Sequence, residues 1–280
     1  QSDQTMRVIK SLAEFQKFRR GINPLEKTLG FVPTMGALHQ GHLSLMKLAR
    51  ENTDLTVTSI FVNPAQFGPN EDFDKYPRTF DDDCQKIIDS GGVDVVLAPT
   101  VMEVYPNHFV TRVHIDQDSF LKDQPEAQQR PGFFNGVATV VTKLFNMVRP
   151  DVAYFGQKDA IQCIVVKKMA QDLNFSPYLK IHIGETVRES DGLAMSSRNR
   201  YLSREDREFA PVMYNALIEA KKYHLSQGGQ VTCKDLVQFT VSKLQAHSSP
   251  TPTSNYCVEY VSICDAENGQ VLTESDQTVP

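Results

Sequence analysis

The sequence lacks several features that would place it in common functional classes. Its 280 residues contain no apolar run of the about 18 to 20 residues that a transmembrane helix needs, so we expect no contact with a membrane. Lysine and arginine number 29 against 34 aspartates and glutamates, and this formal net charge of -5 argues against a general nucleic-acid binder. The first residues, QSDQTMRVIK, contain no signal-peptide core, so we expect a cytoplasmic protein.

The cysteines are scattered along the chain, and their number and spacing argue against two kinds of site. The chain has five cysteines, an odd number, and no CxxC pair occurs among Cys84, Cys163, Cys233, Cys257 and Cys264. This pattern argues against a disulfide framework or a zinc site and indicates reduced thiols. We expect all five to pack as small buried hydrophobic side chains.

The first two thirds of the chain alternate strand patterns with helix patterns. Strands are expected over residues 29–32, 56–62, 93–99, 151–156 and 178–184, and helices over 38–50, 81–90, 136–148 and 158–173. This alternation predicts an α/β fold with a Rossmann-like parallel sheet. Ligands of such sheets bind beyond the carboxyl ends of the strands, so the residues that follow each strand are the candidates for chemistry.

The pattern changes after about residue 185. The elements expected there are a long helix from the Ser203–Asp206 capping box to about Ser226, a helix from Thr232 to about His247, a loop over 248–254 and a half-exposed strand over 255–263. We therefore predict two domains, a Rossmann-like domain over residues 1–185 and a smaller α+β domain over residues 186–280.

The stretch GFVPTMGALHQGHLSLMKLAR, residues 30–50, combines a buried strand, a tight turn and a helix. A helix N-terminus presents unpaired N–H groups that favour phosphate, and Gly36 and Gly41 allow a nucleotide to approach the backbone closely. His39 and His42 are three residues apart, so both would face that ligand. The alternative is that one histidine caps the helix while the other packs; zinc is disfavoured, because no third ligand lies nearby.

Two polar stretches follow the second expected strand. Asn63-Pro64 ends that strand, which places the amide of Gln66 where ligands collect; the alternative is a surface loop with an Asx turn at Asn63. Asp81, Asp82 and Asp83 open a helix, where acids interact favourably with the helix dipole. Binding the magnesium of a nucleotide is the other interpretation of these acids.

Two later stretches carry further candidates. In YFGQKDAIQ, Gly156 ends a strand and Lys158 follows as a phosphate partner, although an ordinary charged helix start would look similar. In VRESDGLAMSSRNRYLS, a flexible Asp191-Gly192 precedes donors that could close over a polyphosphate; a solvated linker is the alternative. No GxxxxGK[ST] loop occurs, so adenylate or nucleotidyl transfer fits better than γ-phosphoryl transfer.

Taken in order, these motifs resemble those of the pantoate–β-alanine ligase family. The resemblance rests on PTMGALHQGHLSL, IFVNPAQFG, YPRT, RPGFFNGVATVVTKLF, AYFGQKD and DGLAMSSRNRYLS, which together extend from about Gly30 to Ser203. It implies a nucleotidylyltransferase-like enzyme with an HxGH turn at His39 and His42. It implies that pantoate attacks the α-phosphate of ATP, with Mg²⁺ present, and that β-alanine then attacks the pantoyl adenylate to release pantothenate and AMP. A homodimer is also implied.

The resemblance also implies residue roles. The residues implied to hold ATP are Met35, Gly36, Ala37, Leu38, His39, Gln40, Gly41, His42, Gly156, Gln157, Lys158, Asp159, Val187, Met195, Ser196, Ser197 and Arg198. Those implied to act in catalysis are His39, His42 (as proton donor), Lys158, Ser196, Ser197 and Arg198. Gln66, Gln162 and Asn63 are implied to bind pantoate, and Gln66 to contact β-alanine as well.

Two other functions remain open from the sequence. One is a related enzyme that transfers a nucleotidyl group to a phosphorylated acceptor, which would not need Gln66 and Gln162 to face a small hydroxy acid. The other is a nucleotide-binding module without catalysis, against which the intact His39, His42 and Lys158 argue.

Overall fold

The computed structural model of the chain describes residues 6–116, 119–247 and 256–279. The chain divides into two compact units, Gln1–Ile115 with Arg130–Val187 and Asp116–Gln129 with Arg188–Pro280. The segment 116–129, which the predicted first domain included, therefore groups with the second unit.

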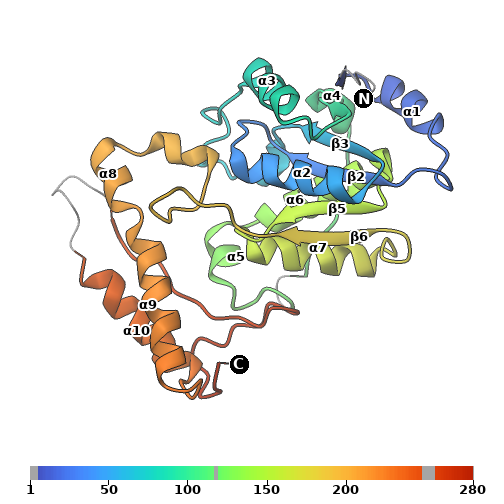
Figure 1. Cartoon of the computed structure of the whole chain (residues 1–280). Helices are drawn as coiled ribbons and strands as arrows, with labels where there is room; N and C mark the ends of the chain where they lie inside the picture. The colour runs from blue at the N-terminus through green and yellow to red at the C-terminus, as the bar shows by residue number, and fades with distance from the viewer. Residues whose placement is uncertain (1–5, 117–118, 248–255, 280) are drawn as a thin grey trace. The chain divides into compact units, whose positions relative to one another are not determined.

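The first unit is a six-stranded parallel sheet with helices between the strands (Figure 1). Its strands are β1 (Arg7–Ile9), β2 (Leu29–Thr34), β3 (Leu55–Ile60), β4 (Val95–Leu97), β5 (Val152–Gly156) and β6 (Lys180–Gly184). Its helices are α1 (Leu12–Arg20), α2 (Gln40–Asn52), α3 (Phe80–Ser90), α4 (Val101–Val104), α6 (Phe133–Val148) and α7 (Ala160–Asp172), with a 3₁₀ turn over Pro64–Gln66. The α/β class is confirmed, as are the five predicted strands and the four helices between them. The sequence analysis missed β1, α1 and α4.

The strand order, β1-β4-β3-β2-β5-β6, reverses direction at β2. After β2 the chain adds β3 and β4 on one side, and later it returns to add β5 and β6 on the other. The register places Leu29 beside Leu55 and Gly30 beside Val152. The carboxyl ends of β2 and β5 therefore bracket the point where ligands bind in sheets of this type.

Helices cover both faces of this sheet. One core forms where α2 and α3 pack on the strands, and it contains Val32, Leu45, Met46, Ile87 and Val96. α7 packs on β5 and on α6, and in Figure 1 it lies on the opposite side of β5 and β6 from α2. Burying β2 on both faces explains its continuous apolar sequence.

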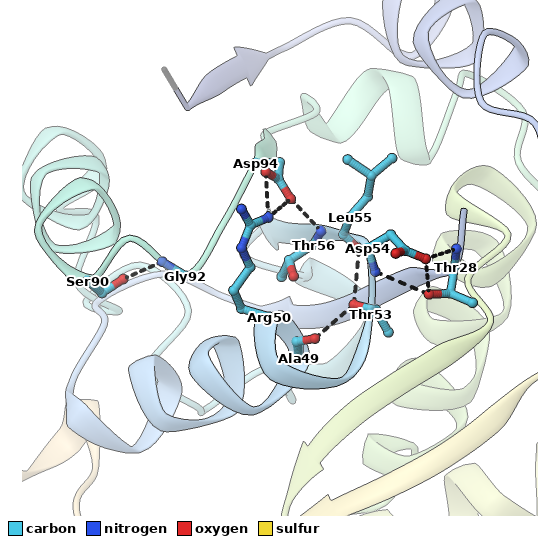
Figure 2. A network of polar contacts seen from close by, with 10 residues as sticks. All are labelled: Thr28, Ala49, Arg50, Thr53, Asp54, Leu55, Thr56, Ser90, Gly92 and Asp94. Atoms are coloured by element: carbon cyan, nitrogen blue, oxygen red, sulfur yellow. Dashed lines mark hydrogen bonds and ion pairs between the residues drawn. The ribbon is translucent and has the colours of Figure 1, made fainter. Parts of the chain in front are cut away.

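A polar network fixes the amino ends of the central strands, at the edge away from the candidate site (Figure 2). The Asp94 carboxylate accepts hydrogen bonds from Arg50 at 2.7 Å and from the Thr56 backbone N–H at 2.7 Å. The Asp54 carboxylate accepts from the backbone N–H and hydroxyl of Thr28, at 2.8 and 2.7 Å. These contacts connect the end of α2 to the starts of β2, β3 and β4.

The described part of the second unit consists mainly of helices. They are α5 (Pro125–Gln129), a 3₁₀ helix over Ser197–Tyr201, α8 (Arg204–Phe209), α9 (Val212–Ser226) and α10 (Cys233–Gln245). Its β structure, among the residues described, is limited to isolated bridges such as Cys264–Val271. The caps expected at Ser203 and Thr232 are confirmed, because the Asp206 and Asp235 backbone N–H groups donate to them.

Two predictions for this unit were wrong. The long helix from Ser203 to Ser226 is interrupted at Ala210-Pro211, because proline has no N–H to donate to the helix. Residues 256–263 form no strand, since alternation alone does not provide a neighbouring strand for hydrogen bonding. The loop predicted over 248–254 lies outside the described residues, as does Asn255.

The cysteines are free, as expected, but burial varies. Cys163 and Cys233 are buried, Cys84 and Cys264 are intermediate, and Cys257 is exposed, so the prediction of five buried side chains was wrong. Among the described residues, helices with the length and apolarity needed to span a membrane are absent.

The packing of α6 on the 3₁₀ turn gives the first testable prediction. A Cβ added at Gly136 would lie 2.1 Å from the Ala65 carbonyl oxygen, a backbone atom that cannot easily move. We therefore expect Gly136→Ala to lower the free energy of unfolding by about 1–3 kcal/mol, the usual cost of overpacking, as measured by urea denaturation. Gly68→Ala is the control, because its Cβ would meet nothing closer than 3.7 Å. Equal stability of the two variants would contradict this packing.

Candidate active site

The turn after β2 has an unusual backbone conformation. Gly36 and Ala37 follow one another with φ angles of +81° and +50°, in the left-handed region that residues with a Cβ adopt rarely. The Thr34 hydroxyl accepts a hydrogen bond from the Gly36 N–H at 3.2 Å. This conformation reverses the direction of the chain sharply just before α2 begins.

One buried carboxylate holds this turn in place. Asp83, on α3, has no exposed surface, and its two oxygens accept hydrogen bonds from the backbone N–H groups of Ala37 at 2.8 Å and Leu38 at 2.7 Å. Lys86, one turn further along α3, donates to the Leu38 carbonyl at 3.1 Å and pairs with Asp82 at 2.8 Å. Asp83 is therefore an anchor of the turn, a role that the sequence analysis, which considered the helix dipole or magnesium, did not foresee.

The two histidines cap α2 together. His39 is the N-cap residue, and its Nδ1 accepts a hydrogen bond from the Gly41 N–H at 3.2 Å. In return, Nδ1 of His42 accepts from the His39 N–H at 3.3 Å, and the ring centroids lie 4.0 Å apart. The sequence analysis considered a capping histidine and a packing histidine. In the structure both side chains cap the helix, and the two rings also lie against each other. Gly41 is needed here, since a Cβ would lie 2.9 Å from the His39 ring.

These bonds determine which nitrogen of each ring carries the proton. Because each Nδ1 accepts from a backbone N–H, the neutral imidazole carries its hydrogen on Nε2. Burial lowers the pKa of His39 to about 4, with the charge of Lys158 contributing, and lowers that of His42 to about 3, with His39 and Lys158 contributing. At neutral pH the free site therefore presents two uncharged Nε2–H donors.

The end of β5 brings a positive charge to the same place. Lys158 follows Gly156 in the turn between β5 and α7, and its ammonium lies close enough to both imidazoles to lower their pKa values. It is half-exposed and pairs with Asp159 at 2.7 Å. Gln157 donates its backbone N–H to the Gly184 carbonyl, which fixes this turn against β6. Val187 lies near Gly41 in the same unit.

The end of β3 holds two of the predicted pantoate residues. Asn63 is 1 % exposed, whereas Gln66 in the 3₁₀ turn is partly exposed. The Asn63 amide nitrogen donates to Oε1 of Gln66 at 2.9 Å, so these two side chains are in direct contact. Gln162 is partly exposed in the first turn of α7.

The remaining predicted residues, Met195–Arg198, belong to the second unit. The Ser196 hydroxyl accepts from the Arg198 N–H at 3.2 Å and caps the 3₁₀ helix. The preceding turn was expected to be flexible, but it packs closely within this unit. Asp191 accepts from Arg207 at 2.6 Å, and a Cβ at Gly192 would lie 2.1 Å from the Tyr214 ring.

Tyr105 was missed by the sequence analysis, and the role of Asp83 as an anchor of the turn was not predicted. Asp83 carries a signal in hindsight, because it lies four residues before the buried Ile87 and therefore on the inward face of α3. Tyr105, which follows α4, donates its hydroxyl to Oδ1 of Asn63 at 2.7 Å. No pattern near Tyr105 links it to Asn63, which lies far away in the sequence.

Comparisons with known proteins identify a matching family and similar structures. Residues 7–279 match the family model described as pantoate-beta-alanine ligase. A pantothenate synthetase of Acetivibrio thermocellus is 45% identical over 269 residues, covering 96% of this chain and 91% of that protein. The crystal structure of pantothenate synthetase from Thermus thermophilus is similar with a TM-score of 0.84 at 41% identity, covering 96% of this chain and 90% of that one.

A second similar structure carries ligands. It is the pantoate-beta-alanine ligase from Francisella tularensis complexed with beta-gamma ATP and beta-alanine, with a TM-score of 0.71 at 34% identity. The match covers 86% of this chain and 87% of that one. The resemblance stated from the motifs is thereby confirmed.

The Asp83 anchor gives a second prediction. In Asp83→Asn the amide keeps one acceptor oxygen, so one of the two turn N–H groups loses its partner. We expect the free energy of unfolding to fall by about 2–3 kcal/mol, and ATP binding, measured by calorimetry, to weaken as well. Asp81→Asn is the matched control, since Asp81 is exposed on the same helical turn. An unchanged ATP affinity in Asp83→Asn would show that the turn does not need this anchor.

The neutral histidines give a third prediction, for pH. Their folded pKa values, about 4 and about 3, lie below the ordinary value of 6.5, so the unfolded chain binds protons first as the pH falls. The stabilising contribution is therefore complete above pH 6.5 and is lost as the pH falls toward 4 and 3. NMR titration should find both rings uncharged at about pH 6. Charged rings at that pH in the ligand-free protein would contradict the burial argument.

Proposed function

The chain belongs to the pantoate–beta-alanine ligase family, and we propose that its HxGH turn binds the phosphates of ATP and promotes adenylation. As a member of this family the protein is an ATP-dependent ligase that joins pantoate and β-alanine through a pantoyl adenylate. Particular residues of this chain are assigned below to the binding of each substrate and to the stabilisation of charge.

One observation carries the assignment: Nδ1 of each imidazole accepts a backbone hydrogen bond at the N-terminus of α2, where the strand order reverses, and this leaves Nε2–H as the donor of each ring. A polyphosphate there would meet backbone N–H groups, both rings and the ammonium of Lys158. Donors already fixed in place need little reorganisation when negative charge develops on the phosphates, and this favours the transition state. Since His42 is uncharged in the free site, it would stabilise the leaving phosphate by hydrogen bonding from Nε2.

The first step forms the mixed anhydride. A carboxylate oxygen of pantoate attacks the α-phosphorus of ATP, the bond to the bridging oxygen breaks, and pyrophosphate leaves with that electron pair. Mg²⁺ enters with ATP as part of the substrate. In the second step the amine of β-alanine attacks the acyl carbon, AMP leaves, and the nitrogen loses a proton to give the amide. The protein's contribution is to position the reactants and to stabilise charge.

The other roles follow the placement of the residues. Gly156, Gln157, Lys158, Asp159 and Val187 would line the nucleotide, together with Met35 through Gly41. Gln66 and Gln162 would bind pantoate with support from Asn63, and Gln66 would also contact β-alanine. Met195, Ser196, Ser197 and Arg198 of the second unit would contact the phosphates. We also propose that the protein is a homodimer and that it acts in the cytoplasm. Both the dimer and the location are expected from the family.

The test is pyrophosphate release from ATP and Mg²⁺, followed in a single turnover. We expect release to depend on pantoate, and pantothenate and AMP to appear only after β-alanine is added. In His42→Ala the adenylation rate should fall by about 10²–10³, the usual effect of removing one charge-stabilising donor. His182→Ala, a change on the exposed side of β6, is the control and should keep the wild-type rate.

Each other outcome has a definite meaning. Wild-type adenylation by the His42→Ala variant would remove His42 from the chemistry. Pyrophosphate release that requires a phosphorylated acceptor in place of pantoate would instead indicate nucleotidyl transfer. ATP binding without any turnover would indicate a binding protein.

A further inference from the structure

The side-chain amide of Asn63 uses its full hydrogen-bonding capacity inside the protein. Its oxygen accepts from the Ala65 N–H at 3.2 Å and from the Tyr105 hydroxyl at 2.7 Å. Its nitrogen donates to Oε1 of Gln66 at 2.9 Å and to the Gly136 carbonyl at 3.2 Å. An amide has two acceptor positions and two donor hydrogens, so none is left for a ligand.

Two of these four partners fix which way the amide points. The Ala65 N–H can only donate and the Gly136 carbonyl can only accept, so the oxygen and the nitrogen of Asn63 cannot be exchanged. The second hydrogen on the nitrogen must then meet an acceptor, which selects the oxygen of the Gln66 amide and not its NH₂ group. By the same argument, the Tyr105 hydroxyl must donate to the Asn63 oxygen.

We propose that Tyr105 and Asn63 are positioning residues that hold the Gln66 amide with its oxygen toward Asn63, so that Gln66 turns its NH₂ group to the substrate. This inference rests on the proposed role of Gln66 in binding pantoate. The NH₂ group of Gln66 makes no hydrogen bond among the described residues and is available. This NH₂ group donates hydrogen bonds to oxygen acceptors, namely the carboxylate or a hydroxyl oxygen of the hydroxy acid. In β-alanine it donates to the carboxylate and does not contact the ammonium group.

The surroundings keep Tyr105 in the required state and position. Burial raises the pKa of its hydroxyl to about 12, so it stays protonated and remains a donor throughout the working pH range. Its ring packs against Phe61 and Phe109, with centroids 6.3 and 5.1 Å away, and the Lys143 ammonium lies 5.7 Å from the ring centroid. The hydroxyl therefore has little freedom to leave Asn63.

α6 supplies the other fixed point of the arrangement. Gly136 lies so close to the 3₁₀ turn that a Cβ there would meet the Ala65 carbonyl and the Gln66 Cα, at 2.1 and 2.7 Å. This close packing allows the Gly136 carbonyl to accept a hydrogen bond from the Asn63 amide. Two separate elements, α6 and the segment after α4, thus fix the orientation of the Gln66 amide.

The first experiment replaces Tyr105 with phenylalanine, which removes only the hydroxyl. We expect the KM for pantoate to rise about threefold to tenfold, the range that one hydrogen bond supports, while the KM for ATP stays within about twofold. Tyr154→Phe is the matched control, because Tyr154 is a buried tyrosine of the same unit whose hydroxyl makes no hydrogen bond among the described residues. Its KM values should equal those of the wild type.

A second measurement tests the amide orientation without turnover. With selectively ¹⁵N-labelled asparagine and glutamine, NMR of the free protein should find both side-chain amide hydrogens of Asn63 protected from exchange with water, and those of Gln66 not protected. Protected Gln66 hydrogens beside freely exchanging Asn63 hydrogens would overturn the inference, whether or not the enzyme turns over.

The kinetic outcomes separate this inference from the proposed function. If the wild type releases pyrophosphate with pantoate but Tyr105→Phe leaves the pantoate KM unchanged, the inference falls and the ligase assignment stands. If the KM values for ATP and pantoate rise together, Tyr105 is structural only, and the inference also falls. If the wild type shows no pantoate dependence, the proposed function falls, and the exchange measurement decides the amide orientation by itself.

Discussion

The candidate site depends on one carboxylate that accepts two backbone hydrogen bonds. Asp83 stabilises a turn in which Gly36 and Ala37 both adopt left-handed conformations, one of them without the freedom of glycine. It supplies charged acceptors for the buried N–H groups of Ala37 and Leu38, and buried polar groups are costly without such partners. The position of α2, and with it the cap formed by His39 and His42, follows from this turn.

The polar groups at the amino ends of the parallel strands are paired differently from those at the carboxyl ends. At the amino edge, the carboxylates of Asp54 and Asp94 are satisfied by groups of the protein itself. At the carboxyl edge, Nε2 of both histidines and the NH₂ group of Gln66 make no hydrogen bond among the described residues. The contrast agrees with the rule that such sheets bind ligands at their carboxyl edge.

Much of this could be predicted from the sequence, because local signals decided it. The β-branched runs gave five strands, Gly91 ended α3 in the left-handed conformation, and the spacing of His39 and His42 placed both on one helical turn. The missed features depend on distant contacts. Asp83 and Tyr105 acquire their roles only when α3 reaches the turn after β2 and Tyr105 reaches the end of β3. The strand expected after residue 255 failed for the related reason that it has no neighbouring strand.

The reversal of strand order at β2 also has a consequence for how the protein is made. β2 can pair with β3 soon after both leave the ribosome, but its other edge stays unpaired until β5 has been synthesised. An open apolar strand edge invites pairing with other chains during that interval. The nascent protein is therefore exposed to aggregation until β5 completes the sheet beside β2, and a product truncated before Gly156 would retain the histidine turn without the charge of Lys158 near it.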